Sequence, residues 1–216
     1  MNITKLDKLW RGRYEEAVKY DMALMLKPGS VDIWYNKGII LGLLGRHNNA
    51  VECFDNVLEM NPYDINTWYN RGLALCLSGK YEEAIECCDM VLARYPNHVD
   101  ALITKGNALY MLKRLRDALK CYDKALKLAP RNPNPWLNKG LILAKLGKHK
   151  DAIKCFDKVL TLDPNSVDAW TNKGSVLYAL GKYKEAIKCF DRALAINPNF
   201  SLARNNKICA LEKLRK

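Results

Sequence analysis

Cysteine is the residue type with the widest range of chemistry in this chain, and it recurs at a fixed interval. The chain has 216 residues and eight cysteines, and five of these lie 34 residues apart, at Cys53, Cys87, Cys121, Cys155 and Cys189. Thiols can bind metal, form disulfides, carry redox chemistry or serve as small buried side chains. The 34-residue spacing allows these roles to be compared.

The spacing favours packing over chemistry. Equivalent positions in stacked repeats are separated by at least one helix layer of roughly 8–10 Å, whereas a disulfide needs Cα atoms closer than about 7 Å. Zinc sites commonly contain C-x₂-C elements. No such element occurs, and His47, His98 and His149 do not cluster with the cysteines. The sequence therefore predicts buried structural cysteines, with no metal and no cofactor.

The cysteine is one position of a 34-residue register that begins at residue 31. The fourth residue of each unit is tryptophan in four of five cases, with leucine in the third unit. Glycine, alanine and proline fill the eighth, twentieth and thirty-second positions without exception. These three sets are Gly38, Gly72, Gly106, Gly140 and Gly174; Ala50, Ala84, Ala118, Ala152 and Ala186; and Pro62, Pro96, Pro130, Pro164 and Pro198.

This pattern resembles the tetratricopeptide repeat (TPR). The resemblance implies an all-α fold, a right-handed α-solenoid of stacked antiparallel helix pairs. The predicted organisation is a degenerate N-terminal repeat or cap (1–30), five repeats (31–64, 65–98, 99–132, 133–166 and 167–200) and a C-terminal capping helix (201–216).

The residues support two helices in each unit. Segments 170–180 and 184–196 have helix length and helical apolar spacing, and a glycine turn separates them. The residues Ser30, Asp64, Asn132 and Ser166 are favourable N-caps, unlike His98. In the N-terminal segment we expect one helix around 2–10 and another over 12–28. Cys88 replaces an aromatic residue, which predicts looser packing in its repeat.

In the family, the first helices line a concave groove. The sixth residue of each unit is asparagine except in the third unit, and Asn206 continues the series. An asparagine amide can bond to an extended peptide backbone or only to groups nearby, and the sequence leaves both open. The predicted groove residues are Tyr35, Asn36, Tyr69, Asn70, Ile103, Tyr110, Leu137, Asn138, Leu141, Asn172 and Tyr178. The lysines of a carboxylate clamp are missing from the fifth position.

The formal net charge of +12 is unevenly distributed. Residues 31–98 carry 5 basic and 9 acidic side chains, whereas residues 99–216 carry 24 and 10. On the second helices of the last three units, residues four apart form a basic stripe on one helix face. The stripe comprises Arg116, Lys120, Lys124, Lys150, Lys154, Lys158, Lys184, Lys188 and Arg192. It is either a solvated surface or a contact for nucleic acid, an acidic protein or an anionic membrane.

A second charged pattern predicts structure. The seventh residue of each unit is Lys or Arg and the twenty-fifth is Asp, as in Lys139 and Asp157. We expect these to form ion pairs within a helix pair or between neighbouring pairs.

The predicted function is a non-enzymatic protein-interaction scaffold that binds a peptide segment or helix in its groove. The alternative is binding of nucleic acid or an acidic partner by the basic stripe. No nucleotide-binding loop or activated nucleophile is evident. The longest strongly apolar stretch, residues 38–45, is too short to cross a bilayer. A cytoplasmic location is expected, and the sequence is compatible with a homo-oligomer.

Overall fold

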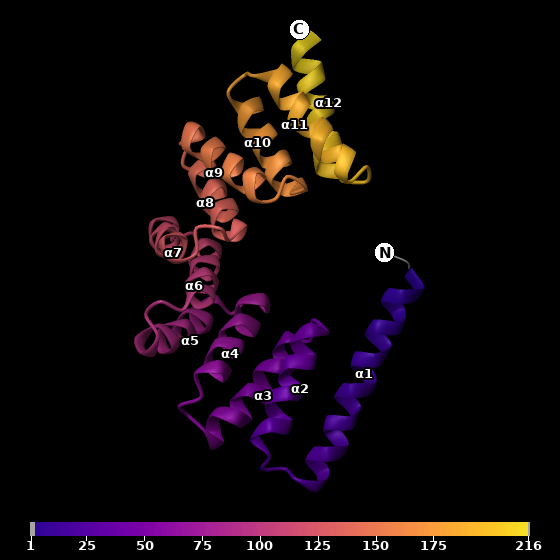
Figure 1. Cartoon of the computed structure of the whole chain (residues 1–216), viewed down its shortest axis with the longest axis vertical. Coiled ribbons are helices and arrows are strands. Elements are labelled where there is room, and N and C mark those ends of the chain that lie inside the picture. The colour runs from indigo at the N-terminus through magenta and orange to yellow at the C-terminus, as the bar shows by residue number, and fades with distance from the viewer. Residues whose placement is uncertain (1–2, 216) are drawn as a thin grey trace. The chain divides into compact units, whose positions relative to one another are not determined.

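The computed structural model describes residues 3–215, with side chains from residue 11 onward, and these residues form twelve helices and no strand (Figure 1). Within residues 3–114 and within residues 115–215, consecutive helices pack against each other. The helices are α1 (Ile3–Leu26), α2 (Val31–Leu43), α3 (His47–Met60), α4 (Ile65–Leu77), α5 (Tyr81–Arg94), α6 (Val99–Met111), α7 (Leu115–Leu128), α8 (Pro133–Lys145), α9 (His149–Leu162), α10 (Val167–Ala179), α11 (Tyr183–Ile196) and α12 (Ser201–Arg215).

The chain divides into two compact units, residues 1–114 with α1–α6 and residues 115–216 with α7–α12. In unit 1, α2, α4 and α6 contact one another in sequence, and in unit 2, α8, α10 and α12 do the same. We call the surface of these helices the first-helix face of each unit. The second-helix face consists of α3 and α5 in unit 1, and of α7, α9 and α11 in unit 2.

The glycine at the eighth position allows the two helices of a pair to approach. A Cβ atom on Gly38, Gly140 or Gly174 would lie 2.6–2.7 Å from a phenylalanine ring of the facing helix. That ring belongs to Phe54, Phe156 or Phe190, and each is almost fully buried. A side chain at the glycine would therefore force the helices apart.

The pair of α4 and α5 corrects one expectation, because Cys88 does not loosen it. Cys88 is fully buried. A Cβ on Gly72 would lie 2.9 Å from the Cys87 Cβ and 3.4 Å from the Ala84 carbonyl oxygen. Where the aromatic ring is missing, the backbones themselves approach and fill the space.

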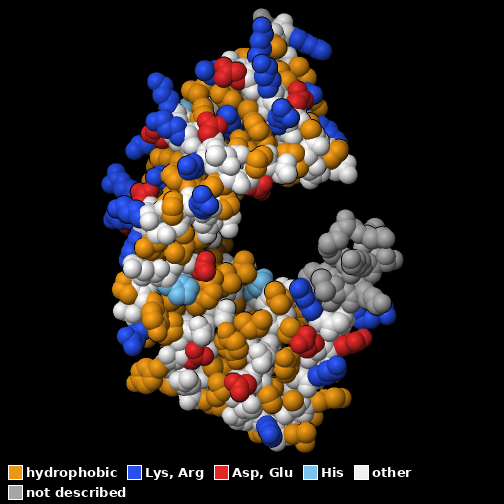
Figure 2. Space-filling view, viewed as in Figure 1, with side chains coloured by type: hydrophobic (Ala, Val, Ile, Leu, Met, Phe, Trp, Pro, Cys, Tyr) orange, Lys and Arg blue, Asp and Glu red, His pale blue; other side chains and the backbone are white. Residues whose placement is uncertain are grey.

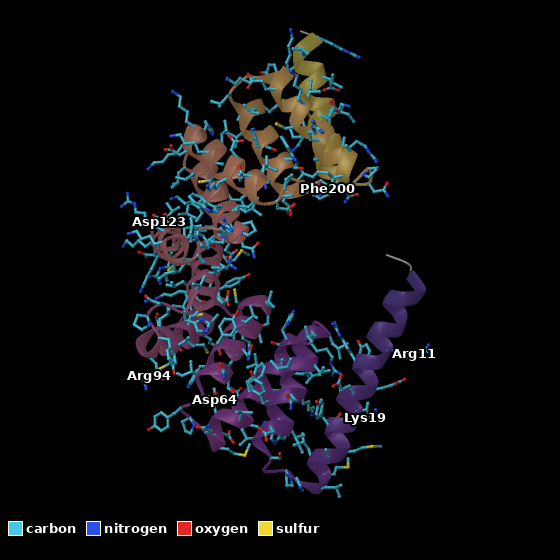
Figure 3. All side chains as sticks on the ribbon, viewed as in Figure 1. Arg11, Lys19, Asp64, Arg94, Asp123 and Phe200 are labelled. Carbon is cyan, nitrogen blue, oxygen red and sulfur yellow. The ribbon has the colours of Figure 1, made fainter. Side chains whose placement is uncertain are left out.

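Neighbouring pairs are joined by the same polar contacts in each unit. Lys139 of α8 bonds to Asp123 of α7 at 2.6 Å, and its ammonium group lies 5.7 Å from the centre of the Trp136 ring. Figure 3 places Asp123 on α7. The Trp136 indole N–H donates to the Pro130 carbonyl oxygen at 3.0 Å. The ion pair thus links a second helix to the next first helix, and it recurs as Lys37–Asp21, Arg71–Asp55, Lys105–Asp89, Lys173–Asp157 and Lys207–Asp191.

Helix ends follow the sequence signals with two exceptions. Asp64, Asn132 and Ser166 accept a backbone N–H of the helix that they precede. His98 also caps its helix, because its Nδ1 atom accepts the Ala101 N–H at 3.1 Å. Ser30 has capping backbone angles but makes no such bond.

The N-terminal segment forms one helix, which corrects the expectation of two. Helix α1 continues through Arg11 and Gly12 and ends at Leu26. One glycine disfavours a helix by only about 1 kcal/mol, and no turn residues accompany it. The part of the expected first helix at residues 1–2 lies outside the described residues.

Candidate peptide-binding groove

The first-helix face of unit 1 contains an apolar hollow of about 300 Å³ between α2 and α4. Small residues and branched aliphatic side chains form most of its lining, and His47, Phe54 and Asn70 form the rest. The lining residues are Gly38, Ile39, Gly42, Leu43, His47, Phe54, Asn70, Leu73, Ala74 and Leu77. Such a hollow can accept an apolar side chain of a partner.

Two features of the sequence create the hollow. Gly42 and Ala74 leave room on facing helices, and a Cβ on Gly42 would have no neighbour closer than 4.0 Å. Leu43 and Leu77 occupy the thirteenth position of successive units and are 49% and 59% exposed. Exposed leucines beside a small-residue floor make this part of the surface apolar and open.

The asparagine at the sixth position bonds between neighbouring first helices in two places. Asn70 donates from Nδ2 to the Tyr35 hydroxyl at 2.8 Å. Burial raises the pKa of Tyr35, and the bond to Asn70 partly offsets that rise. Asn206 donates to the Ser175 hydroxyl at 3.1 Å. These two amides therefore connect adjacent helices of one face. Of the other asparagines at this position, Asn36 is exposed, and Asn138 and Asn172 are half-buried.

The other predicted groove residues differ in their surroundings. Ile103 is buried, and Tyr110 is half-buried. The Tyr69 ring lies 5.0 Å from the His98 ring, and that of Tyr178 lies 5.4 Å from Tyr183. Half-buried Leu137 and Leu141 pack against the core of unit 2. These residues are thus largely engaged within their own units.

Sequence reasoning did not single out Gly42, Leu43, His47 and Leu77 as site residues. One signal in the sequence pointed to them. The thirteenth position of a repeat faces the groove in the family, and here it is leucine in two successive repeats, at 43 and 77. The hollow itself depends on the small side chains opposite, which only the packed structure brings together.

The second-helix face of unit 2 carries the basic stripe. All nine of its side chains are exposed, on α7, α9 and α11. Lys120 and Lys154 each pair with an aspartate three residues earlier at 3.2 Å. Figure 2 shows Lys and Arg side chains gathered along the edge formed by α7 and α9. The stripe is therefore a solvent-facing surface of concentrated positive charge.

Four of the five recurring cysteines are buried, and the fifth, Cys121, is half-buried. All eight cysteines are free thiols, and Cys53, Cys87, Cys155 and Cys189 are buried. Burial raises the pKa of Cys53 and Cys155 to about 11. Within residues 3–215, no three His, Cys, Asp or Glu side chains converge as a metal site requires. Reactive thiols need a lowered pKa, so these side chains are suited to packing.

Family models identify the chain by sequence. Tetratricopeptide repeat models match residues 31–64, 133–166 and 167–200, and a further one matches 63–131. The chain belongs to the tetratricopeptide repeat family, whose members generally act as protein-interaction scaffolds without catalysis. An uncharacterized protein of Methanocaldococcus jannaschii is 42% identical over 45 residues, a match that spans 20% of this chain and 52% of that protein.

Solved structures share the fold at low identity. YrrB, described as a TPR protein with an unusual peptide-binding site, gives a TM-score of 0.66 at 22% identity, covering 87% of this chain and 97% of YrrB. A TPR protein of Parabacteroides merdae gives 0.73 at 18% identity over 96% of this chain and 81% of its own. The thermophilic TPR protein TTC0263 of Thermus thermophilus gives 0.68 at 23% identity, covering 84% and 99%. No helix within residues 3–215 is both long and apolar enough to cross a membrane.

Proposed function

We propose that this chain is an interaction scaffold that binds a peptide segment or helix on its first-helix face. The observation that carries the proposal is the apolar hollow of unit 1, with its exposed rim of Leu43 and Leu77. A hollow of about 300 Å³ suits one large aliphatic or aromatic side chain. Amphipathic helices dock through such anchors at helical spacing. YrrB supports the idea at the level of the fold, because its description includes a peptide-binding site.

The test is selection from a displayed library of random peptides against the whole chain. We expect enrichment of leucine, isoleucine or phenylalanine at positions three or four apart. Gly42→Leu should fill the hollow and weaken the selected peptides at least about tenfold, which corresponds to about 1.4 kcal/mol. Gly12→Leu is the matched control, because Gly12 has open space around it on α1.

Circular dichroism and affinity together distinguish a loss of binding at the hollow from a loss of folding. Both variants should keep the helical circular-dichroism signal. Equal binding by Gly42→Leu and the control would contradict docking in the hollow. Selection of charged peptides without apolar anchors would contradict the proposed ligand class.

The half-buried asparagines of unit 2 offer a second contribution to the same function. A peptide crossing Asn138 and Asn172 could exchange backbone hydrogen bonds with their amides, each contributing about 0.5–1.5 kcal/mol. The double change Asn138→Ala with Asn172→Ala should then weaken a selected peptide by about tenfold. If the melting temperature falls but the affinity is unchanged, these amides support the structure and not the ligand.

A second candidate function rests on the basic stripe, since all nine of its side chains are exposed. It would bind an anionic partner such as nucleic acid. Lys150→Glu, Lys154→Glu and Lys158→Glu together should abolish binding to a DNA duplex and leave the helical signal unchanged. For a single change, the slope of log affinity against log salt should become shallower by about 0.9 for each phosphate that is no longer neutralised. Absence of salt-sensitive binding by the unmodified chain would exclude this function.

A further inference from the structure

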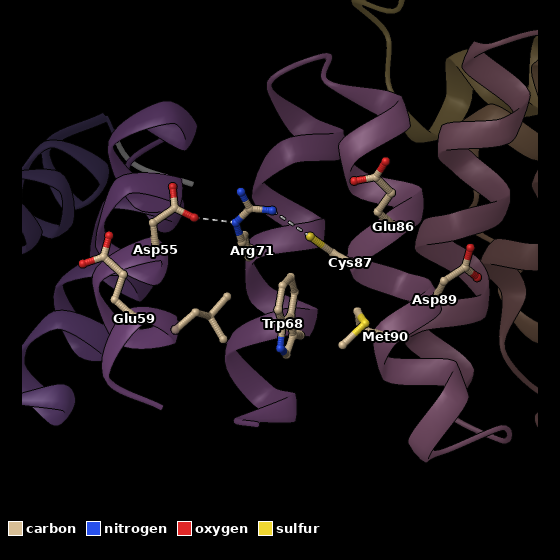
Figure 4. Close-up of a pocket in the computed structure, with 9 residues that line it drawn as sticks. Asp55, Glu59, Trp68, Arg71, Glu86, Cys87, Asp89 and Met90 are labelled. Atoms are coloured by element: carbon tan, nitrogen blue, oxygen red, sulfur yellow. Dashed lines mark hydrogen bonds and ion pairs between the residues drawn. The ribbon is translucent and has the colours of Figure 1, made fainter. Parts of the chain in front are cut away.

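A second cavity lies on the second-helix face of unit 1. It has a volume of about 850 Å³ and lies between α3 and α5, with α4 behind it (Figure 4). Leu58, Trp68 and Met90 supply apolar walls, and Glu59 and Glu86 supply carboxylates. The cavity is therefore both apolar and acidic.

The positive charge inside this cavity is already engaged. The Arg71 guanidinium donates from Nε to Asp55 at 2.6 Å and from Nη1 to the Cys87 sulfur at 3.0 Å (Figure 4). Burial lowers the pKa of Arg71, but its bonds to Asp55 and Cys87 outweigh this effect and raise it. Arg71 thus stays charged and compensates Asp55, and Lys105 pairs with Asp89 in the same way.

Two carboxylates remain without such compensation. Glu59 and Glu86 are exposed and form no ion pair among the described residues. In Figure 4, Glu59 lies to the left of Trp68, and Glu86 lies above Met90. A lysine or arginine side chain matches this arrangement, because its methylene groups can pack on the apolar wall while its charged end reaches the carboxylates.

The second-helix faces of the two units carry charges of opposite sign. Unit 1 presents Glu52 and Glu59 on α3 and Glu82 and Glu86 on α5, all exposed. Unit 2 presents the basic stripe on α7, α9 and α11. Both surfaces consist of successive second helices. The charges of the basic stripe recur every 34 residues, and among the acidic residues Glu52 and Glu86 lie 34 residues apart. Two neighbouring acidic helices can therefore face two neighbouring basic helices.

We propose that the acidic second-helix face of unit 1 docks on the basic stripe of unit 2 in a second copy of this chain. Lysine and arginine side chains of the stripe would enter the cavity at Trp68 and approach Glu59 and Glu86. Complementary charge mainly sets the choice and orientation of the partner. Burial of side-chain methylenes against Trp68 and Met90 adds an apolar contribution.

Salt dependence is the first signature of this contact. Screening shortens the reach of exposed charges from about 10 Å at 0.1 M salt to about 3 Å at 1 M. Sedimentation velocity over about 1–100 µM chain should show concentration-dependent self-association at about 50 mM salt that disappears at about 500 mM. A monomer throughout this range at low salt would overturn the proposal.

Charge exchange is the decisive experiment. The acidic-face variant carries Glu59→Lys and Glu86→Lys, and the basic-face variant carries Lys150→Glu and Lys158→Glu. Each alone should weaken self-association at least tenfold. An equimolar mixture should associate again, because the unmodified basic stripe of the acidic-face variant meets the unmodified acidic face of the basic-face variant.

Controls match each variant in charge. Glu15→Lys with Glu212→Lys, and Lys27→Glu with Lys213→Glu, change the net charge equally on exposed residues of other surfaces. Both should associate like the unmodified chain. If the controls weaken association as much as the face variants, or if the mixture stays monomeric, these two faces do not pair. Self-association that responds to Gly42→Leu but to neither face variant would assign the contact to the first-helix face and also overturn the proposal.

Discussion

At the residue scale, the recurring cysteine shows how a chemically versatile side chain serves as a packing element. Its spacing predicted burial, and the structure buries Cys53, Cys87, Cys155 and Cys189. The bond from Arg71 to the Cys87 sulfur could not be predicted. It depends on arginine replacing lysine at one position of the series and on the close approach of α4 and α5.

The buried thiols predict a loss of stability in alkali. Burial raises the pKa of Cys53 and Cys155 to about 11, whereas an exposed thiol titrates near 8.5. Between these values the unfolded chain has lost the proton and the folded chain has kept it. Stability from this source is therefore complete below about pH 8.5 and falls as the pH rises toward 11.

The measurement is the melting temperature between pH 8 and pH 11. It should fall less steeply in Cys53→Ala with Cys155→Ala than in the unmodified chain. The exposed Cys209 provides the control, since Cys209→Ala should leave the slope unchanged. Identical slopes in all three chains would show that these thiols do not limit alkaline stability.

At the element scale, repeated positions predicted the helix pairs and their closest contacts. The fixed glycine, alanine and proline indicated where helices approach and end, and α2 to α12 follow this pattern. The continuous helix α1 could not be inferred, because a lone glycine at Gly12 is compatible with either a break or a helix. Capping by His98 was missed for a related reason, since its ring nitrogen acts only when the imidazole is neutral and turned toward the backbone.

Two glycines of similar helical context should respond oppositely to alanine. A Cβ on Gly140 would lie 2.6 Å from the Phe156 ring, so Gly140→Ala should destabilise the chain by about 1–3 kcal/mol. Gly12 has nothing within 4 Å, so Gly12→Ala should stabilise it by about 0.5–1 kcal/mol. Urea denaturation gives both values. A stabilising Gly140→Ala would mean that the ring moves aside without cost.

The turn between α6 and α7 contains an unusual backbone conformation. Lys113 has φ 61°, in a position where the other turns have Gly45, Gly79, Gly147 and Gly181 with φ between 72° and 87°. The left-handed conformation costs a non-glycine residue roughly 1–2 kcal/mol. Lys113→Gly should raise the stability by about 1 kcal/mol after the entropy of the new glycine is subtracted.

Urea denaturation measures this gain as well. The reverse change, Gly147→Lys, should lower stability by a similar amount and serves as the matched control. Stability unchanged in both variants would show that lysine adopts this conformation without strain.

At the scale of the whole molecule, the sequence predicted the all-α class and the family but not the division into two units. The 34-residue register runs through the predicted repeat 99–132 without a gap, whereas the structure assigns α6 to unit 1 and α7 to unit 2. Uniform spacing cannot predict such a division, because the same interval separates every pair of successive repeats. The apolar hollow was missed likewise, since it arises from side chains of two repeats together.

Local destabilisation should remain local in such a chain. Within each unit the described helices contact near neighbours, so stability is close to a sum of repeat and interface contributions. Gly140→Leu should accelerate amide hydrogen exchange in α8 and α9 far more than in α2 and α3. Uniform acceleration over both units would instead indicate one cooperative structure.

The repeated joint between helix pairs has a consequence for how such a chain can change in length. Each joint uses the same lysine or arginine with the same aspartate. In four of these joints the tryptophan N–H donates a hydrogen bond to the carbonyl oxygen of the preceding proline. Because the parts are interchangeable, a duplicated copy of residues 133–166 would find a matching partner at both of its ends. Gene duplication in whole 34-residue steps can therefore lengthen the molecule without inventing a new interface, and each addition would extend the first-helix face by one helix.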